Sequence, residues 1–232
     1  MFSKVFLAMT AREMEGILPN QVAYMACHFS PYSKGLSNIP PQLPKNSFLL
    51  VDDSMPVQGH DPELVASQLK ELVEMFSVGA VLLDFQRERS NPTAEMAASI
   101  LQTLPCPVAI TEHYAIALNC PVFLSPTPVN MALEDHLKDW RKQGVYLEIA
   151  PEARRFTVTE EGCTDTPLPI RTAPVLPLKD ERLHCRYGVE VLEDRAIFTL
   201  CRTGEDLAAL VNEAYSLGVQ GVVGLFQELS RL

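Results

Sequence analysis

The chain alternates between short apolar runs and amphipathic segments. Eight continuous apolar runs are bounded by turn residues, and runs of this kind are typical of strands that are buried on both faces of a parallel sheet. Segments with helical periodicity follow several of them, so strands and helices alternate along most of the chain. The eight expected strands are Val22–His28, Ser47–Asp52, Ala80–Gln86, Pro107–Glu112, Pro121–Ser125, Val145–Ala150, Ala196–Cys201 and Gly221–Phe226.

Four helices are expected between these runs, and three of them begin with a capping signal. A pair of Asp or Asn with Pro opens two helices, because it combines an N-cap with a proline at the first helical position. A Thr-x-x-Asp capping box opens the third, and glycine follows two of the four. The signals and helices are Asp61–Pro62 before Leu64–Phe76, Asn91–Pro92 before Thr93–Leu104, Thr203 with Asp206 before Leu207–Leu217 and Gly218, and Met131–Gln143 before Gly144.

Two segments depart from this alternation. The gap between the expected strands near residues 110 and 121 leaves room for a single helical turn, around Tyr114–Leu118. Residues 151–195 are rich in proline and charge, and their runs Arg155–Thr159 and His184–Leu192 alternate apolar and polar residues, which is typical of hairpin strands. The segment Met1–Pro19 fits a strand or a helix equally well.

Eight buried strands with intervening helices predict an α/β fold of the TIM type. We expect a (β/α)8-like barrel that is irregular where helices are missing. An open doubly wound sheet is the alternative, but the sequence contains neither the G-x-G-x-x-G fingerprint nor a P-loop. A length of 232 residues suits one domain. We therefore expect residues 1–232 to form a single barrel domain, with a β-hairpin insert at 151–195 packed on its edge.

Composition and charge narrow the function classes. The chain carries 19 Lys and Arg against 29 Asp and Glu, a net charge of −10, so no general binding to nucleic acid or to an anionic membrane surface is expected. We find no apolar run long enough for a transmembrane helix and no signal-peptide pattern. The six cysteines show no C-x-x-C pair and no zinc-ligand spacing. We expect reduced thiols, a cytoplasmic location and no cofactor, and the sequence leaves the oligomeric state undefined.

In a parallel barrel, chemistry takes place at the C-terminal ends of the strands. Asp84 and Gln86 share a strand face with Ala80 and Leu82, and this alternation directs both polar side chains into the barrel mouth. Glu148 shares its face with Tyr146 in the same way. Charged groups in apolar strands are costly unless they are paired or face a cleft, so we expect a polar ligand. The candidate catalytic residues are Asp84, Glu112 and Glu148, and the candidate ligand-binding residues are His28, Tyr32, Asp52, Gln86 and Tyr114.

Each of the three carboxylates also has a structural interpretation. Asp84 would form an ion pair with Arg87 or Arg89 at the mouth. Glu112 would place its charge at the N-terminus of the short helix that follows, and Glu148 would pair with the arginines of the insert. In that case the carboxylates would stabilise the fold and would carry no chemistry.

The run Gly79–Gln86 resembles the signature of family 18 glycoside hydrolases, the chitinase-like barrels, which reads D-G-x-D-x-D-[FWY]-E on one strand. Asp84 and Phe85 match its last aspartate and its aromatic residue. Gly79 and Leu82 replace the other two aspartates, and Gln86 replaces the catalytic glutamate, although a glutamine cannot protonate a leaving group. The resemblance implies a TIM barrel that acts on a carbohydrate or binds one.

Several functions therefore remain open. A glycoside hydrolase-like enzyme would use Glu112 and Glu148 together with Asp84, whereas a non-catalytic barrel that binds a glycan or another polar ligand is favoured by Gln86. A metal-dependent hydrolase of unknown substrate is a further alternative, with ligands drawn from the histidines and carboxylates of the mouth, although no H-x-H strand motif is present. The chain also fits a bacterial barrel family without an assigned reaction. The sequence does not define the substrate.

Overall fold

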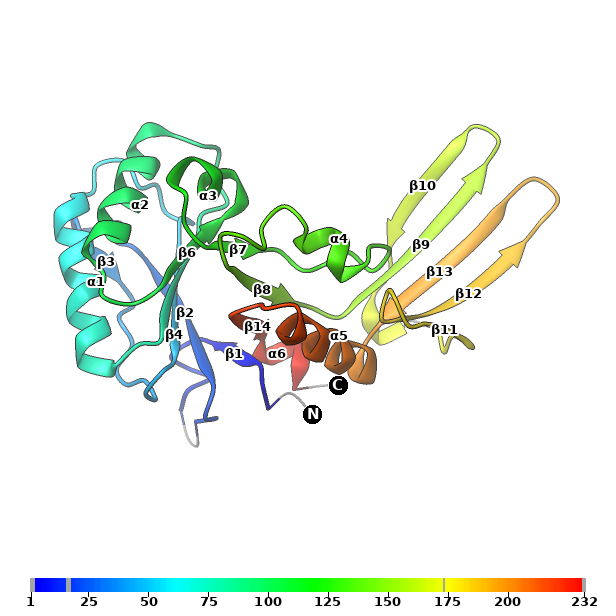
Figure 1. The fold of residues 1–232 in the computed structure, drawn as a ribbon, viewed down its shortest axis with the longest axis horizontal. Helices are drawn as coiled ribbons and strands as arrows, with labels where there is room; N and C mark the ends of the chain where they lie inside the picture. The colour runs from blue at the N-terminus through cyan, green and yellow to red at the C-terminus, as the bar shows by residue number, and fades with distance from the viewer. Residues whose placement is uncertain (1–2, 16–17, 173, 231–232) are drawn as a thin grey trace.

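The computed structural model describes residues 3–15, 18–172 and 174–230. Eight parallel strands form a closed barrel, because β1 pairs with both β14 and β2 and so joins the two ends of the sheet. This arrangement confirms the predicted TIM-type barrel (Figure 1). Around the ring, the strands are β1 (Phe6–Met9), β2 (Val22–Phe29), β4 (Phe48–Asp52), β5 (Ala80–Asp84), β6 (Val108–Thr111), β7 (Val122–Leu124), β8 (Val145–Ile149) and β14 (Gly221–Leu225).

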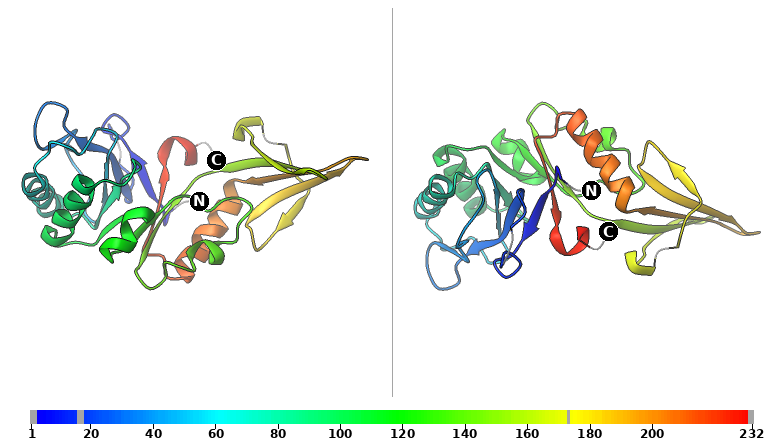
Figure 2. Two further views of the ribbon diagram at one scale, coloured as in Figure 1. Left: turned by 90° about the horizontal axis from the view of Figure 1, so that it is seen from above. Right: turned by 90° about the horizontal axis from the view of Figure 1, so that it is seen from below.

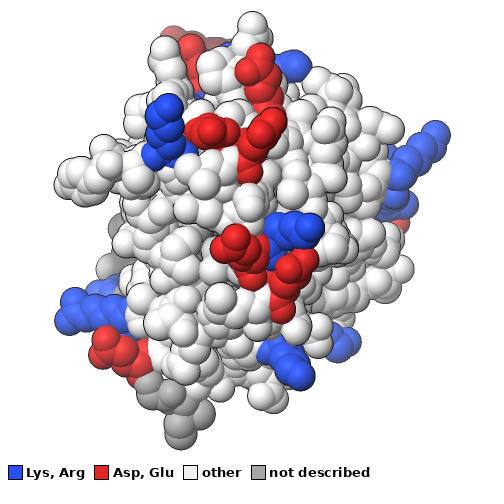
Figure 3. Space-filling model, turned by 90° about the vertical axis from the view of Figure 1, so that its left-hand side faces the viewer, with Lys and Arg blue, Asp and Glu red and all other residues white. Residues whose placement is uncertain are grey.

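Helices cover the barrel unevenly, as predicted. In the part of the chain that the structure describes, no helix follows β1 or β2, and the two-residue strand β3 (Leu36–Ser37) pairs antiparallel with β2 instead. None of the described helices is long and apolar enough to cross a membrane. The helices are α1 (Pro62–Phe76), α2 (Asn91–Thr103), α3 (Glu112–Leu118), α4 (Leu133–Leu137), α5 (Gly204–Ser216) and α6 (Phe226–Leu229). On the side of the molecule shown in Figure 3, Lys and Arg side chains are scattered among acidic ones and form no continuous basic patch.

The capping signals were partly correct. The side chain of Asp61 caps α1 as predicted, accepting hydrogen bonds from two backbone N–H groups of the first turn. For α2 the N-cap is Ser90 rather than Asn91, and the Ser90 hydroxyl accepts from the Thr93 N–H. Thr203 occupies the N-cap of α5, but its side chain makes no capping hydrogen bond, so the predicted capping box is not formed.

The helix predicted at 131–143 is much shorter in the structure. Only Leu133–Leu137 is helical. The chain then continues in tighter turns, in which Trp140 N–H donates to the Leu137 carbonyl and Gln143 N–H to the Trp140 carbonyl. These bonds span three residues rather than four, so the α-helix ends early.

The apolar core has two layers. The inner layer fills the barrel and consists of ten buried side chains, among them three aromatic residues and four alanines. Gly221 makes room for one ring, since a Cβ atom there would lie 2.6 Å from the ring of Phe48. The outer layer packs between the strands and the helices. The inner-layer residues are Ala8, Ala23, Phe48, Leu50, Ala80, Leu82, Ala109, Phe123, Tyr146 and Val223.

One of the eight predicted barrel strands was assigned to the wrong sheet. Ala196–Arg202 is β13 of a separate antiparallel sheet, and the eighth barrel strand is β1, from the segment 1–19 that had fitted either a strand or a helix. Residues 1–2 and 16–17 of that segment lie outside the described residues. β1 has only four residues, too few for periodicity to distinguish the two.

The antiparallel sheet forms a projection that extends from the barrel between β8 and α5, and we call it the wing (Figures 1 and 2). Two of its hairpins follow the predicted pattern, with turns at 160–161 and 192–195. Its strand order is β10-β9-β13-β12-β11. The strands are β9 (Glu152–Thr159), β10 (Gly162–Pro167), β11 (Leu178–Asp180), β12 (Cys185–Val191) and β13 (Ala196–Arg202).

A buried arginine fixes the base of the wing to the barrel. The Arg202 side chain is only 1% exposed, and its guanidinium donates to the backbone carbonyls of Thr127 and Pro128, in the loop after β7, and of Leu183 and His184, in the loop before β12. Burial lowers the pKa of Arg202 from its usual value. Four carbonyl acceptors compensate for much of the cost of removing this cation from water.

Candidate functional site

Three candidate residues lie side by side at the C-terminal ends of neighbouring strands. His28 on β2 is the register partner of Asp52 on β4, and Asp52 is the partner of Asp84 on β5. Asp52 and Asp84 alternate with outer-layer residues and share strand faces with inner-layer residues such as Leu50 and Leu82. Their carboxylates are therefore directed to the barrel axis at the mouth.

A β-bulge directs His28 to the same place. Between Tyr24 and Cys27, β2 has two residues opposite the single residue Leu50 of β4. Because of this extra residue, Tyr24, Cys27 and Phe29 all pack in the outer layer, and His28 between the last two faces inward. The His28 Nδ1 atom lies 3.1 Å from the carbonyl oxygen of Ala26.

The strongest electrostatic perturbation in the mouth is at Glu148. It follows the inner-layer residue Tyr146 by two positions on β8, so it points to the barrel axis. Burial raises the pKa of Glu148 from 4.5 to about 7, and the charges of Asp84 and Glu228 contribute to this rise. These carboxylates thus form one coupled group, in which burial and the neighbouring negative charges favour the protonated form of Glu148.

The pKa of Asp84 is also raised, mainly by burial. A hydrogen bond of 2.5 Å from the side-chain amide of Gln86 opposes this rise, whereas the charges of Asp52 and Asp53 add to it. Asp84 and Glu148 thus differ. Gln86 favours the ionised form of Asp84, whereas among the described residues no such donor acts on Glu148.

A small cavity of about 150 Å³ lies beside this group, at the ends of β1 and β14. Inner-layer neighbours line its floor, and Thr10, Glu13, Gln227 and Glu228 supply polar groups. Burial alone would raise the pKa of the Glu13 carboxyl. Hydrogen bonds from the Thr10 N–H, the Gln227 side chain and the Thr10 hydroxyl outweigh this effect, and the pKa is lowered. One carboxylate oxygen of Glu228, Oε2, is buried and has no hydrogen-bond partner within the described residues.

The sequence places Glu228 at the end of the last strand but does not single it out as a candidate site residue, and it gives no indication of Glu13. Glu13 follows β1, which was not recognised as a strand, so no strand end was available to place it. Glu228 follows a predicted strand, but it lies within the first turn of α6, where the alternation of a strand no longer applies. A carboxylate within the first turn after a barrel strand is the signal that would have found it.

The structure does not bring Glu112 to the other carboxylates. It is the first residue of α3, at the helix N-terminus, as the structural interpretation of this residue expected. The charges that raise the pKa of Glu148 are those of Asp84 and Glu228. Glu228 therefore takes the place in the coupled group that the sequence had suggested for Glu112.

The two candidate tyrosines differ in exposure. Tyr114 is fully buried in the outer layer, with its ring edge against Phe85 and its hydroxyl accepting from the Ser90 N–H. It has no surface to offer a ligand. Tyr32 is 96% exposed in the loop between β2 and β3.

The ion pairs that would make Asp84 and Glu148 structural are not formed among the described residues. Arg87 donates to the backbone carbonyls of Asp53 and Ser54, and the buried Asp53 carboxylate accepts from the N–H groups of Gln86 and Arg87. In the insert, Arg154 pairs with Glu152 and Asp165 rather than with Glu148. Within the part of the chain that the structure describes, no cation therefore pairs with either carboxylate.

Two other kinds of site, a metal centre and a cysteine nucleophile, have little support. Across residues 3–15, 18–172 and 174–230, no three His, Cys, Asp or Glu side chains are close enough to share a metal ion. His60 binds the carbonyls of Val57 and Ser30 instead. Burial, together with the charge of Asp52, raises the pKa of the Cys27 thiol to about 12, which suppresses the nucleophilic thiolate.

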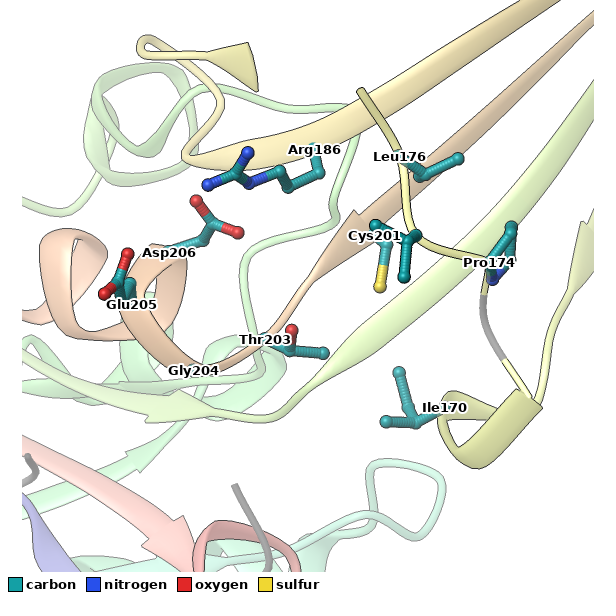
Figure 4. Close-up of a pocket in the computed structure, with 10 residues that line it drawn as sticks. Ile170, Pro174, Leu176, Arg186, Cys201, Thr203, Gly204, Glu205 and Asp206 are labelled. Carbon is teal, nitrogen blue, oxygen red and sulfur yellow. The ribbon is translucent and has the colours of Figure 1, made fainter. Parts of the chain in front are cut away.

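Two of the cavities that are larger than the one beside the coupled group lie at the base of the wing. One of about 570 Å³ adjoins the C-terminal ends of β7 and β8 and is lined by Pro126, Ala150 and Arg154, among others. The other, about 350 Å³, lies where α5 begins, and there Arg186 and Asp206 point toward each other (Figure 4). Neither is lined by the coupled carboxylates, so we place the candidate site in the mouth.

No protein-family model and no curated protein sequence matches the chain. Solved structures do resemble it in fold. The spore cortex-lytic enzyme SleL of Bacillus megaterium QM B1551 has a TM-score of 0.54 and 9% identity over 95% of this chain and 69% of its own. SleL of Bacillus cereus has a TM-score of 0.51 and 8% identity, over 88% and 63%. The chitinase of Chromobacterium violaceum ATCC 12472 has a TM-score of 0.52 and 9% identity, over 88% and 86%.

These similarities concern the fold. They confirm the resemblance to chitinase-like barrels that the run Gly79–Gln86 suggested, at the level of the backbone. Identities of 8–9% do not transfer an activity or a set of catalytic residues.

Proposed function

We propose that the protein is a glycoside hydrolase-like enzyme that cleaves a glycan in the barrel mouth. The observation that carries this proposal is the coupled group, in which Glu148 has a pKa of about 7 beside Asp84, whose ionised form Gln86 stabilises. Glycosidases need such a pair, one carboxyl group protonated and the other ionised at the working pH. The likeness of the fold to a chitinase and to spore cortex-lytic enzymes supports a glycan as the substrate.

In the proposed reaction, Glu148 is the general acid. Its proton goes to the glycosidic oxygen as the bond from that oxygen to the anomeric carbon breaks. The Asp84 carboxylate stabilises the positive charge that develops on the sugar, and water then adds to the anomeric carbon and returns a proton to Glu148. Glu228 helps to keep Glu148 protonated before the reaction, because its charge disfavours ionisation of its neighbour.

Gln86 has a different role in this proposal from the glutamate that it replaces in the chitinase-like signature. Its amide cannot supply a proton, but it donates a hydrogen bond to Asp84. The acid is then provided from β8 rather than from β5. This assignment is specific to the present chain, since it depends on the position of Glu148.

A non-catalytic glycan-binding barrel is the second candidate, and Gln86 in the acid position favours it. Both candidates predict that soluble chitin oligosaccharides bind in the mouth, which isothermal titration calorimetry measures. Only the enzyme releases new reducing ends. Binding without release in the wild-type protein would reject the enzyme and retain the binding barrel.

Substitutions of Asp84, Glu148 and Glu112 test the roles that the proposal gives to these residues. Asp84→Asn should abolish activity while the free energy of unfolding changes by less than about 1 kcal/mol, because a carboxylate at the mouth holds little of the fold together. Glu148→Gln should lower the rate by about 100-fold or more. Glu112→Gln is the matched control and should be as active as the wild type. A loss of roughly 3 kcal/mol or more in Asp84→Asn would identify Asp84 as structural and contradict its place in the site.

All six cysteines are free, and four of them are buried. This supports a reducing compartment, and we propose the cytoplasm as the location. Quantification of free thiols in protein purified under oxidising conditions, compared with reduced protein, tests this. Six reactive thiols after unfolding are expected.

A further inference from the structure

One cavity at the base of the wing combines a charged side with an apolar side. It has a volume of about 350 Å³ and lies where α5 begins. Charged side chains from β12 and from the first turn of α5 line one side, and apolar side chains line the other (Figure 4). We call it the α5 cavity and define it by Ile170, Leu176, Arg186, Thr203, Glu205 and Asp206.

Asp206 supplies a buried carboxylate to this cavity. The residue is only 5% exposed, and among the described residues its side chain neither accepts a hydrogen bond nor forms an ion pair. Burial raises the pKa of Asp206, whereas the charges of Arg186 and Lys179 oppose this rise. A buried carboxylate is costly unless it is paired, so a ligand that donates hydrogen bonds or carries a positive charge would stabilise it.

Arg186 faces this carboxylate from β12 without pairing with it. Figure 4 shows the charged ends of Arg186 and Asp206 directed toward each other across the cavity. Within residues 3–15, 18–172 and 174–230, the Arg186 side chain makes no hydrogen bond and no ion pair, and its charge acts on Asp206 through space. One molecule that carries both a negative and a positive charge would satisfy both groups.

The remaining charges favour such a molecule over one with a single charge. Lys179 adds a second cation and Glu205 a second anion to the charges near Asp206, and His184 contributes least. An amine or a metal ion would leave Arg186 unpaired, and a simple carboxylate would leave Asp206 unpaired. A zwitterion pairs with both and adds no net charge to surroundings that are already balanced.

The apolar side and the volume restrict the rest of the ligand. Leu176 and Cys201 belong to one buried cluster, and Ile170 packs against it. Burial and the charge of Asp206 raise the pKa of the Cys201 thiol, so this group stays uncharged. A volume of about 350 Å³ lies near the lower end of the roughly 300–1,000 Å³ of small-molecule sites. These features suit a molecule of amino-acid size with an apolar side chain.

We propose that the α5 cavity binds a free α-amino acid with an apolar side chain. The carboxylate of the amino acid accepts two hydrogen bonds from the Arg186 guanidinium, and its ammonium group donates to the Asp206 carboxylate. The Thr203 hydroxyl, which makes no capping hydrogen bond in α5, accepts a second ammonium proton. The side chain of the ligand packs on Ile170 and Leu176. This site is separate from the glycan site proposed above and does not depend on it.

Isothermal titration calorimetry on the full chain at neutral pH tests the proposal, with leucine as the first probe. We expect a dissociation constant of about 10–500 μM, because the ligand is small and few groups hold it. N-acetyl-leucine has no ammonium charge and leucinamide has no carboxylate, so each should bind at least about tenfold more weakly than leucine. The proposal is overturned if leucine, methionine and phenylalanine all fail to bind at about 10 mM, or if leucinamide or N-acetyl-leucine binds as tightly as leucine.

A substitution of Arg186 locates the binding. Arg186→Gln should weaken leucine binding at least about tenfold while the protein stays folded, because the side chain is exposed. It should also abolish the difference between leucine and leucinamide, since the guanidinium contacts only the carboxylate. Arg195→Gln removes the same charge at the far hairpin turn and should bind leucine like the wild type.

Asp206→Asn tests the other half of the site. It should weaken leucine binding and reduce the preference for leucine over N-acetyl-leucine, because the contact with the ammonium group loses its charge. Wild-type affinity for leucine in Arg186→Gln would overturn the proposal, and so would an equal loss of affinity in Arg195→Gln. Circular dichroism and the melting temperature of each variant verify that it is folded.

Discussion

Replacing Glu148 by glutamine is expected to stabilise the folded protein above pH 7 and to leave its stability unchanged below pH 4.5. The pKa of Glu148 rises from 4.5 to about 7 on folding, first because of burial and then because of Asp84 and Glu228. Between these two pH values the unfolded chain releases this proton while the folded chain retains it. The wild type therefore loses stability as the pH rises through this window, and the loss is complete above pH 7.

The magnitude follows from the same two values. At 1.36 kcal/mol for each pKa unit, the difference between 4.5 and about 7 corresponds to about 3 kcal/mol. Glutamine has nearly the same shape and no charge to bury. The free energy of unfolding of Glu148→Gln should thus exceed that of the wild type by up to about 3 kcal/mol at high pH.

Urea denaturation at about pH 4, 6 and 8 measures this difference, with Glu112→Gln as the matched control. Glu112 begins α3 outside the coupled group, so its replacement should give no gain that grows with pH. If Glu148→Gln is no more stable than the wild type at pH 8, or if its gain is the same at every pH, the carboxylates of the mouth do not converge as the structure indicates.

Three further substitutions test the surroundings of the site. Asp53→Ala removes the acceptor of two backbone N–H groups after β5 and should cost about 2–3 kcal/mol; an unchanged urea midpoint would contradict this. Arg202→Met leaves four carbonyls at the base of the wing without a donor and should cost about 3 kcal/mol, with faster amide exchange in β9 and β13; unchanged exchange would argue against an anchoring role. Gly221→Ala forces a Cβ against the Phe48 ring and should lower stability by about 1–3 kcal/mol, and a melting temperature equal to that of the wild type would refute the close contact.

Most of the barrel could be predicted because its strands are buried on both sides. Such strands give continuous apolar runs, and seven of the eight predicted strands are barrel strands. The run Ala196–Cys201 looks the same in sequence, yet β13 lies in the antiparallel wing, where both sides are partly open. A short apolar run does not indicate which sheet its strand will join, because the choice of sheet depends on contacts between segments that are distant in the sequence.

The site was predictable where strand alternation holds. Asp84 and Glu148 follow inner-layer residues by two positions, and both face the mouth. The rule does not reach Glu112, because β6 ends at Thr111 and Glu112 is already the first residue of α3. The inward direction of His28 was not predictable in this way, because it depends on the bulge in β2, which leaves no mark in the sequence.

The pH dependence of reducing-end release from soluble chitin oligosaccharides tests the central claim most directly. If Glu148 is the acid and Asp84 the ionised partner, kcat/KM must rise with pH as Asp84 loses its proton, at a pH above 3.8, the usual pKa of an aspartate. It must then fall as Glu148 loses its proton near pH 7. The wild type should therefore give a bell-shaped profile with its descending limb near pH 7, and Glu148→Gln should lose that limb together with most of the rate. Release that stays constant through pH 7, or no release by the wild type at any pH, would contradict the claim.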